Sequence, residues 1–388
     1  MNDSLRSPAT SAEVAARAGV SRTTVSFVLN GVTDRGISEA TRDKVLAVAR
    51  ELGYAANAAA RQLAGGASGT VGLVIAQASH LYTDVFLSQM VASVNDACHR
   101  EGLKLLIEST EGEGREPGGF VDLLRARRID GLLIVSPRRD VHDHLYRIAE
   151  AGIPMVVLGP APSGLAPMQA LGSDNPGAVR QLMGHLQALG HRRIGHVAFA
   201  PPDLLAVHER VGSWREALEA GGEGAEPGWL THADISAASG HAATVQLLAQ
   251  QAALPAARRI TALFAGNDTI AFGALRALHE AGVRVPDDLA LVGYDDIPLA
   301  AYASPPLTTV RTDPIGQGLE AVVRLVAQMR PGRAASVAPR QATAPTPPTA
   351  AEAQMASPLS PASSSSSPLP LSKPPMPELV VRASCGAR

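Results

Sequence analysis

Apolar residues recur at three- and four-residue spacing in three stretches near the start of the chain, residues 10–19, 21–31 and 38–53. This spacing places one apolar stripe along each of three helices. The first stretch opens with Thr10 and has Glu13 three residues later, which is the spacing of a capping box. The expected core-facing positions are Val14, Ala15, Ala18, Val25, Val28, Leu29, Ala40, Val45, Val48, Ala49 and Leu52.

A short turn that carries Gly19 joins the first two predicted helices, and Ser21 is the expected N-cap of the second. Two helices joined by a tight glycine turn form the helix-turn-helix layout, in which the second helix enters the DNA major groove. The same pattern also suits a small helical bundle of no special function. Helix geometry alone leaves both interpretations open.

An alanine-rich stretch, residues 55–63, follows the third helix and leads into Ala64-Gly65-Gly66. We interpret it as a short helix, which is marginal in water by itself and therefore orders only on contact with a partner. The two glycines then indicate a flexible linker.

From Thr70 onward, apolar runs alternate with helix-like stretches. The runs are residues 71–75, 103–107, 131–135, 154–158, 194–199, 262–264 and 289–292. Such alternation is typical of parallel sheets covered on both faces, and this many units predicts two α/β lobes. Ligands of these folds bind beyond the carboxyl ends of strands. Polar residues follow two of the runs, at Asn267-Asp268 and Asp295-Asp296.

The composition changes again after Met329, because residues 331–375 consist largely of Pro, Ala and Ser. Such a stretch cannot bury enough apolar surface to order itself. Residues 378–382 then have the pattern of one more strand. The Pro/Ser-rich stretch is therefore either an insertion before a last strand or an ordinary disordered C-terminus.

Charge and cysteine content add a little to this picture. Residues 1–66 contain eight Lys or Arg and six Asp or Glu, a net charge of +2, so the remainder carries −4 of the total of −2. A basic head on an acidic body suits DNA binding at one end. Two cysteines, Cys98 and Cys385, exclude a disulfide scaffold. With no apolar signal segment and no run of 18 apolar residues, we expect a cytoplasmic protein without a membrane span.

The sequence offers no catalytic constellation. Asp295 and Asp296 are neighbours at a strand end, so we expect their carboxylates to point to opposite sides. His185, His191 and His196 are six and five residues apart, which matches no pair of metal ligands on a helix. A phosphate-binding glycine loop and a nucleophile elbow are both missing from the sequence. We therefore expect neither an enzyme nor a metal or cofactor site.

The ordered motifs of the chain resemble those of the lactose-repressor (LacI/GalR) family. The head carries VAARAGVSRTTVSFVLNG at residues 14–31, TRDKV at 41–45 and LGY at 52–54, and NAAARQL at 57–63 is similar to the family's hinge helix. The body carries VGL at 71–73, DGL at 130–132, GHRRI at 190–194, ND at 267–268, VPDD at 285–288, GYDD at 293–296 and PLTT at 306–309. The resemblance covers residues 10 to about 329 and 378–385. The Pro/Ser-rich stretch departs from the family pattern.

The resemblance implies an N-terminal all-α helix-turn-helix head and an α/β body similar to periplasmic binding proteins, with two doubly wound parallel-sheet lobes. The expected boundaries are a head at 1–56, a hinge helix and linker at 57–69, an N-lobe at 70–171 and 313–332, a C-lobe at 172–312 and 377–388, and a disordered Pro/Ser/Ala-rich insertion at 333–376.

The function that the resemblance implies is a homodimeric repressor, which binds a near-palindromic operator in double-stranded DNA and is controlled by a small-molecule effector between the lobes. Two rival classes share parts of this layout. A periplasmic ligand-binding protein would need a signal peptide and no DNA-binding head. An architectural DNA-binding protein would have no use for an effector site.

The residues that the resemblance assigns to DNA lie on the second helix and the hinge. They are Ser21, Arg22, Thr23, Thr24, Ser26, Phe27, Asn30, Asn57, Ala60 and Leu63. Arginine suits a bidentate contact to guanine, and Ser or Thr bonds bases or phosphates. Phe27 replaces the polar residue of many relatives, so it either contacts a thymine methyl group or packs within the head. The hinge leucine, Leu63, would wedge into the minor groove and kink the DNA.

The effector residues implied by the resemblance are Phe86, Arg210, Asn267 and Asp295. Arg, Asp and Asn together offer fixed donors and acceptors, which suits a sugar or another polyhydroxyl compound. Gly159 stands where some sugar-binding relatives have an aspartate, and Thr312 where one has a glutamine. These two departures leave the identity of the effector open.

Overall fold

The computed structural model describes residues 9–29, 35–54, 67–76, 79–110, 118–199, 204–330 and 377–387. The chain divides into two compact units, Met1–Ser68 and Gly69–Arg388, which we describe separately. The predicted hinge helix at 57–63 and the Pro/Ser/Ala-rich insertion at 333–376 both lie outside the described residues.

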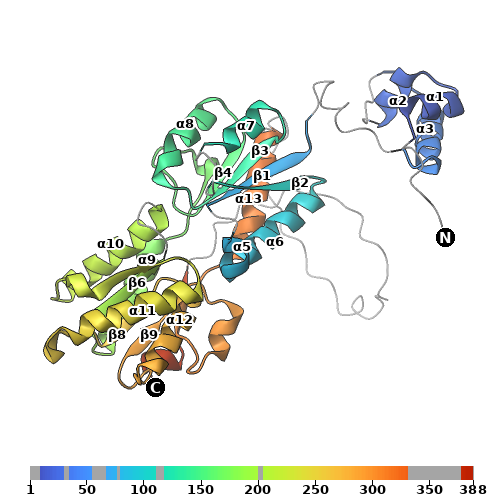
Figure 1. Cartoon of the computed structure of the whole chain (residues 1–388). Coiled ribbons are helices and arrows are strands. Elements are labelled where there is room, and N and C mark those ends of the chain that lie inside the picture. The colour runs from blue at the N-terminus through green and yellow to red at the C-terminus, as the bar shows by residue number, and fades with distance from the viewer. Residues whose placement is uncertain are drawn as a thin grey trace, which may run out of the picture. The chain divides into compact units, whose positions relative to one another are not determined.

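The first unit packs three helices around a small apolar core: α1 (Ser11–Ala18), α2 (Arg22–Leu29) and α3 (Glu39–Glu51) (Figure 1). The predicted capping box is confirmed, because the Glu13 amide donates to Thr10 Oγ1 at 3.3 Å and the Thr10 amide donates to Glu13 Oε2 at 2.6 Å. Gly19 ends α1 with a φ of 68°, a left-handed conformation that glycine adopts at little cost.

Serine hydroxyls cap the other two helices, and the cap predicted at Ser21 is confirmed. The Thr24 amide donates to Ser21 Oγ at 3.0 Å, and the Thr41 amide donates to Ser38 Oγ at 3.3 Å. One core-facing prediction is wrong, because Ala40 is exposed. It precedes Val45 by five residues, which turns it about 140° away from the buried face of α3 at 100° per residue. The buried core of this unit consists of Val14, Ala15, Ala18, Val25, Val28, Val45 and Ala49.

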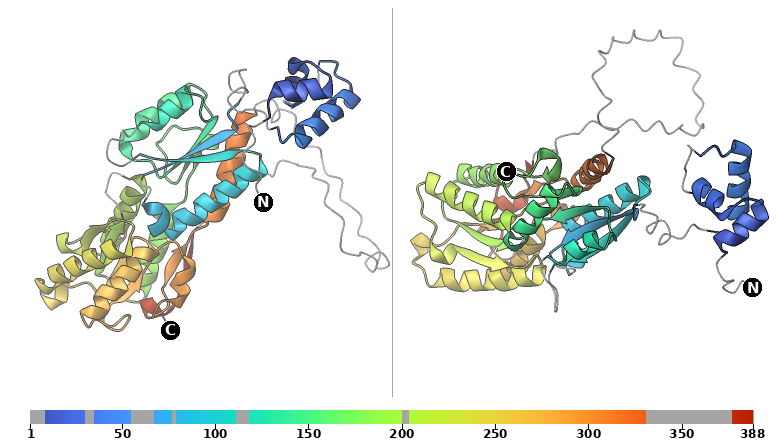
Figure 2. Two further views of the ribbon diagram at one scale, coloured as in Figure 1. Left: turned by 45° about the vertical axis from the view of Figure 1, so that its right-hand side comes forward. Right: turned by 90° about the horizontal axis from the view of Figure 1, so that it is seen from above.

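The second unit contains two parallel sheets, which form the cores of two lobes. The sheet of the first lobe has the order β2-β1-β3-β4-β5. Its strands are β1 (Thr70–Ile75), β2 (Lys104–Ser109), β3 (Gly131–Val135), β4 (Met155–Leu158) and β5 (Ala170–Leu171). One face is covered by α6 (Val85–Arg100) and α13 (Pro314–Met329), which lie side by side in Figures 1 and 2. The other face is covered by α7 (Phe120–Arg125) and α8 (His142–Glu150).

The sheet of the second lobe has the order β7-β6-β8-β9. Its strands are β6 (Ile194–Phe199), β7 (Leu230–Ala233), β8 (Ala262–Ala265) and β9 (Ala290–Val292). Two helix pairs cover it: α9 (Asn175–Ala188) with α10 (Leu205–Ala220), and α11 (Ala237–Ala252) with α12 (Asp268–Glu280). Trp214, Tyr294 and Phe264 are fully buried in its core.

Elements from distant parts of the sequence complete both lobes. Helix α13 follows the second lobe in sequence but packs on α6 of the first. Strand β11 (Glu378–Val380) pairs antiparallel with β10 (Thr309–Arg311) beside the second lobe, so Val380 lies opposite Thr309. The strand expected at 378–382 forms over the shorter range Glu378–Val380, and residues 331–376 connect two packed elements.

All seven apolar runs form strands, whereas β5, β7 and β10 were not predicted. These three strands have two to four residues each, and alternate residues of the edge strand β7 are exposed or half-buried. They therefore lack the continuous apolar run of a strand that is covered on both faces. Short elements complete the structure: α5 (His80–Thr83) and the 3₁₀ helices Arg139–Val141, Pro167–Gln169, Pro227–Trp229, Ala256–Arg258, Pro298–Tyr302 and Ala383–Cys385.

No helix among the described residues is long and apolar enough to cross a membrane.

We expect Thr10→Ala to destabilise the first unit by about 1 kcal/mol, because it removes the hydroxyl that caps α1. Urea unfolding of the full chain, followed by NMR signals of residues 11–29, measures this change. Thr10→Ser keeps the hydroxyl and serves as the control. Equal stability of the alanine variant and the wild type would contradict a capping contribution from Thr10.

Candidate functional site

The outward face of α2 presents the polar residues predicted to meet DNA. Arg22, Thr23 and Ser26 are exposed, whereas Val25 and Val28 on the opposite face are buried. The hydroxyl groups of Ser21 and Thr24 lie 2.9 Å apart, so this pair stabilises the start of the helix. The structure thus places an arginine and two hydroxyls on one accessible helix face, as base and phosphate recognition requires.

Phe27 is half-buried on α2, and the Arg35 guanidinium lies 5.4 Å from the centre of its ring. Partial burial fits both interpretations of this residue, contact with a thymine methyl group and packing within the head. The remaining predicted DNA contacts, Asn30, Asn57, Ala60 and Leu63, lie outside the described residues.

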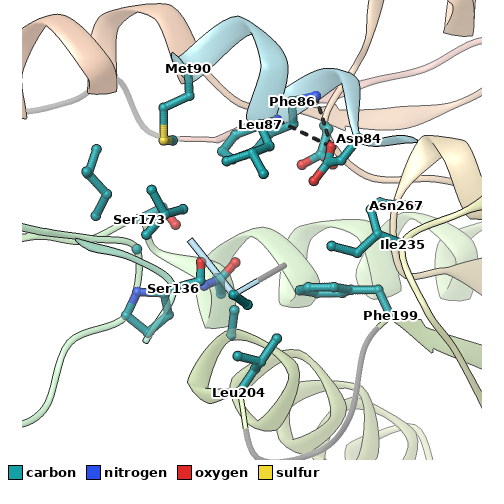
Figure 3. A pocket seen from close by; sticks show the side chains of 18 of the residues that line it. Asp84, Phe86, Leu87, Met90, Ser136, Ser173, Phe199, Leu204, Ile235 and Asn267 are labelled. Atoms are coloured by element: carbon teal, nitrogen blue, oxygen red, sulfur yellow. Dashed lines mark hydrogen bonds between the residues drawn. The ribbon is translucent and has the colours of Figure 1, made fainter. Parts of the chain in front are cut away.

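A cleft opens in the second unit where the carboxyl ends of the strands of both lobes face each other. The empty space within it, counted together with the open solvent at its mouth, is about 830 Å³. Figure 3 shows Asp84, Phe86, Leu87 and Met90 of the first lobe on one side and Phe199, Leu204, Ile235 and Asn267 of the second lobe on the other. All four predicted effector residues, Phe86, Arg210, Asn267 and Asp295, line this cleft.

Arg210 supplies the positive charge of the cleft from helix α10, where it is 9% exposed. Its Nε donates to Asn175 Oδ1 at 3.0 Å and its Nη1 donates to the Gly266 carbonyl at 2.8 Å. Its Cζ lies 3.6 Å from the centre of the Tyr294 ring and 4.7 Å from that of Phe199. These contacts fix the plane of the guanidinium, and the described part of the chain makes no hydrogen bond to Nη2.

Asn175 is a member of the site that sequence reasoning missed. It is buried at the start of α9, where its Nδ2 donates to Glu209 Oε2 at 3.0 Å. Its Oδ1 accepts from both Arg210 Nε and the Tyr294 hydroxyl, the latter at 3.1 Å. The side-chain amide of Asn175 thereby orients both the Arg210 guanidinium and the Tyr294 ring that stacks against it. A sequence signal existed, because Asp174-Asn175-Pro176 opens a helix directly after the first lobe.

Asn267 follows β8 and caps α12, because its Oδ1 accepts from the Ile270 amide at 2.7 Å. The cap uses the side-chain oxygen, so the amide nitrogen is the group that this residue offers to a ligand.

Asp295 supplies an acceptor from a turn beyond β9. It is half-buried, and no described residue donates a hydrogen bond to its carboxylate. Burial raises its pKa well above the usual range, the Arg210 guanidinium opposes this shift, and the carboxylates of Asp84 and Asp268 add to it. A polar ligand in the cleft would provide the hydrogen bonds that this group lacks.

The backbone at this turn is strained, with φ angles of 109° at Asp295 and 53° at Asp296. Each such residue costs about 1–3 kcal/mol and persists only where its surroundings hold it. The two carboxylates point to different partners, as expected: Asp295 faces the cleft, whereas Asp296 pairs with Arg311 at 2.8 Å and Arg382 at 2.7 Å. The turn begins after β9 has ended, so strand alternation is not the reason for their divergence.

The first lobe contributes a second carboxylate, which was also missed. Asp84 caps α6 by accepting from the Phe86 amide at 3.0 Å and the Leu87 amide at 3.4 Å, as drawn in Figure 3. Burial raises its pKa to about 6, and these amide bonds and Arg210 oppose the shift. The cleft therefore places acidic groups of both lobes near one arginine.

The remaining wall of the first lobe combines small residues, among them Ser136 and Gly159, with larger apolar ones such as Ile75 and Leu158. Gly159 has a φ of 89°, and a Cβ there would meet Ser136 Oγ at 3.2 Å. Thr312 does not line the cleft, whereas Gln317 of α13 does. Among the described residues, no group of three or more His, Cys, Asp or Glu side chains could hold a metal ion.

A helix-turn-helix unit followed by a two-lobed body, with a cleft that places a few polar groups among apolar ones, is the architecture of a ligand-responsive DNA-binding regulator. Comparison with known proteins identifies the family. The model described as "Bacterial regulatory proteins, lacI family" matches residues 10–57, and that described as "Periplasmic binding protein-like domain" matches residues 183–349. The chain is 38% identical to the HTH-type transcriptional regulator CelR of Thermobifida fusca over 301 residues, which cover 76% of this chain and 85% of CelR.

A second relative is the HTH-type transcriptional repressor PurR of Aliivibrio fischeri (strain MJ11), with 31% identity across 83% of this chain and 92% of PurR. Among solved structures, a CelR–cellobiose complex is similar with a TM-score of 0.59 and 34% identity, and covers 83% of this chain and 94% of that one. A Lac repressor dimer bound to operator and the anti-inducer ONPF has a TM-score of 0.71 and 31% identity, with coverage of 84% and 94%.

The chain belongs to the LacI family and is a DNA-binding transcriptional regulator. The family assignment and the fold class inferred from the motifs are confirmed. The family is made up of regulators rather than enzymes.

Replacing Asp84 by Asn tests the carboxylate in the first lobe. Its pKa is raised from 3.8 to about 6, so the folded state binds more protons than the unfolded state between these pH values. The stability that the raised pKa of Asp84 provides to the wild type at low pH is therefore lost as the pH rises through this window. We expect Asp84→Asn, which keeps a capping oxygen, to gain stability over the wild type by about 1 kcal/mol between pH 4 and 7, since partial exposure reduces the effect.

Urea unfolding at several pH values measures this difference. Asp96→Asn, at an exposed position of the same helix, is the matched control substitution. A stability difference between Asp84→Asn and the wild type that is constant from pH 4 to 7 would exclude the raised pKa.

Proposed function

We propose that this regulator is a homodimeric repressor that binds a near-palindromic operator. A sugar-like effector in the cleft either releases the repressor from the operator or promotes its binding there. Two groups beside the cleft carry the effector assignment: the Arg210 Nη2 donors and the Asp295 carboxylate, neither of which has a hydrogen-bond partner among the described residues. A fixed donor and a fixed acceptor in an otherwise mostly apolar pocket suit the adjacent hydroxyl groups of a sugar. The solved complex of CelR with cellobiose supports this ligand class.

The dimer proposal draws on the family. The Lac repressor structure is a dimer bound to operator, and two heads reading two half-sites would explain a near-palindrome. On each head, Arg22, Thr23 and Ser26 would meet bases and phosphates. Leu63 would wedge into the minor groove at the operator centre, at a cost of a few kcal/mol that wider contacts on bent DNA offset. Such a protein works where bacterial DNA lies, in the cytoplasm.

Control by the effector follows from the division of the cleft between lobes. Phe86 belongs to the first lobe, whereas Arg210, Asn267 and Asp295 belong to the second. A ligand that contacts both sides binds the closed arrangement more tightly than the open one, and this difference in affinity shifts the population. If the closed and open arrangements space the two hinge helices differently, ligand binding changes operator affinity. The coupling free energy equals that by which operator binding changes ligand affinity.

Arg22→Ala should relax operator specificity, because one bidentate arginine contact to guanine discriminates against other bases by about 1–3 kcal/mol. Selection of bound fragments from random or genomic DNA, followed by sequencing, measures the preference at each position. Arg50→Ala, an exposed arginine of α3, is the matched control and should leave the preference unchanged. An unaltered sequence preference in the Arg22 variant would refute its base-reading role.

Asp295→Ala should abolish the effector response while operator affinity without effector stays within about twofold. Titration calorimetry with cellobiose, and operator binding measured by fluorescence anisotropy with and without it, separate the two effects. Asp96→Ala, on the exposed face of α6, serves as the control. A variant that still responds normally to the sugar would remove Asp295 from the site.

A further inference from the structure

We propose that Arg382, near the end of the chain, is a positioning residue of the effector cleft, because it fixes the turn that presents Asp295. The inference deepens the proposed effector function and rests on it. It gives the last segment of the chain, residues 377–387, a role in sensing in addition to its place in the fold.

The segment at 377–387 is built into the second lobe beside that turn. Ser384 is fully buried, and its Oγ donates to the Leu291 carbonyl of β9 at 2.6 Å and accepts from the Thr308 amide at 2.8 Å. The Ser384 amide donates to the Pro306 carbonyl at 3.0 Å. One serine therefore connects β9 with the chain that leads into β10, and these two strands flank the turn at residues 293–297.

Arg382 connects the same two parts of the chain through its side chain. Its Nη1 donates to the Leu307 carbonyl at 2.7 Å, and its Nη2 donates to Asp296 Oδ1 at 2.7 Å. Its backbone amide donates to Thr308 Oγ1 at 2.8 Å. The side chains of Arg382 and Asp296 are 18% and 8% exposed, so this ion pair is largely protected from solvent.

Arg311 also pairs with Asp296, but from a different environment. Its Nε donates to Oδ2 at 2.8 Å, its side chain is 52% exposed, and it reaches Glu378 at 3.4 Å as well. An exposed ion pair contributes little because water and salt screen it. Arg382 is thus the constraint expected to dominate, and Arg311 offers a matched comparison on the same carboxylate.

The position of Asp296 determines that of Asp295. Both residues have positive φ, and the turn is further tied by the Asp295 amide, which donates to the Val310 carbonyl at 2.7 Å, and the Ile297 amide, which donates to Asp268 Oδ2 at 2.9 Å. Consecutive non-glycine residues keep this conformation only where several contacts enforce it. Without Arg382, the exposed Arg311 is the one ion-pair partner that the described residues leave to the Asp296 carboxylate. The turn then loses its buried ion pair and holds Asp295 at the cleft less firmly.

The test compares Arg382→Ala, Arg382→Lys and Arg311→Ala in the full chain. Hydrogen exchange followed by mass spectrometry measures the exchange rates of the backbone amides of residues 293–297 in the absence of ligand. We expect Arg382→Ala to accelerate their exchange at least tenfold, with α12 and β8 unchanged. Arg311→Ala should change the exchange less than twofold, and Arg382→Lys, which keeps the charge, should recover most of the protection.

Titration calorimetry with cellobiose gives the second measurement. Arg382→Ala should weaken cellobiose binding at least tenfold, while operator affinity without sugar stays within twofold of the wild type. Unchanged exchange at 293–297 in Arg382→Ala would overturn the proposal, as would an acceleration spread over the whole second lobe. If the wild type does not bind cellobiose, the sugar part of the proposed function fails, whereas the exchange data still decide the role of Arg382.

Discussion

The architecture of the cleft depends on how the protein compensates the charge of one buried side chain, the guanidinium of Arg210. A guanidinium removed from water is costly unless hydrogen bonds and charges replace its hydration. Arg210 obtains these from the Asn175 side chain, the Gly266 carbonyl and the faces of Tyr294 and Phe199. Each partner comes from a different element of the second lobe, so the cation and the packing of that lobe constrain each other.

The charge of Arg210 also sets the electrostatics of its neighbours. It opposes the rise in pKa that burial imposes on Asp295 and on Asp84, which belongs to the other lobe. Low dielectric strengthens such interactions, and a ligand that displaces water from the cleft would strengthen them further. The site is therefore polar at a few points and apolar elsewhere, because each polar group needs a compensating partner.

The sequence predicted the helices of the head well because caps are local: Thr10, Ser21 and Ser38 make hydrogen bonds within three residues of themselves. It also predicted the strands that are buried on both faces. The site was less accessible to sequence reasoning. Arg210 and Asp295 were assigned by resemblance, and Asn175, Asp84 and Gln317 were missed because their importance arises from contacts between distant segments. Asn175, for example, meets Arg210 and Tyr294 from 35 and 119 residues away.

The connections between the two lobes limit how they can move. Only three residues separate β5 of the first lobe from α9 of the second, and two separate β10 from α13 on the return. The third crossing, residues 331–376, spans 46 residues and sets no comparable limit on distance. The two short connections lie at two points, and the line through these points is an axis about which the lobes can rotate. A rotation of the lobes about that line changes the lengths of these connections least, so the covalent path of the chain favours one direction of opening, whichever molecule occupies the cleft.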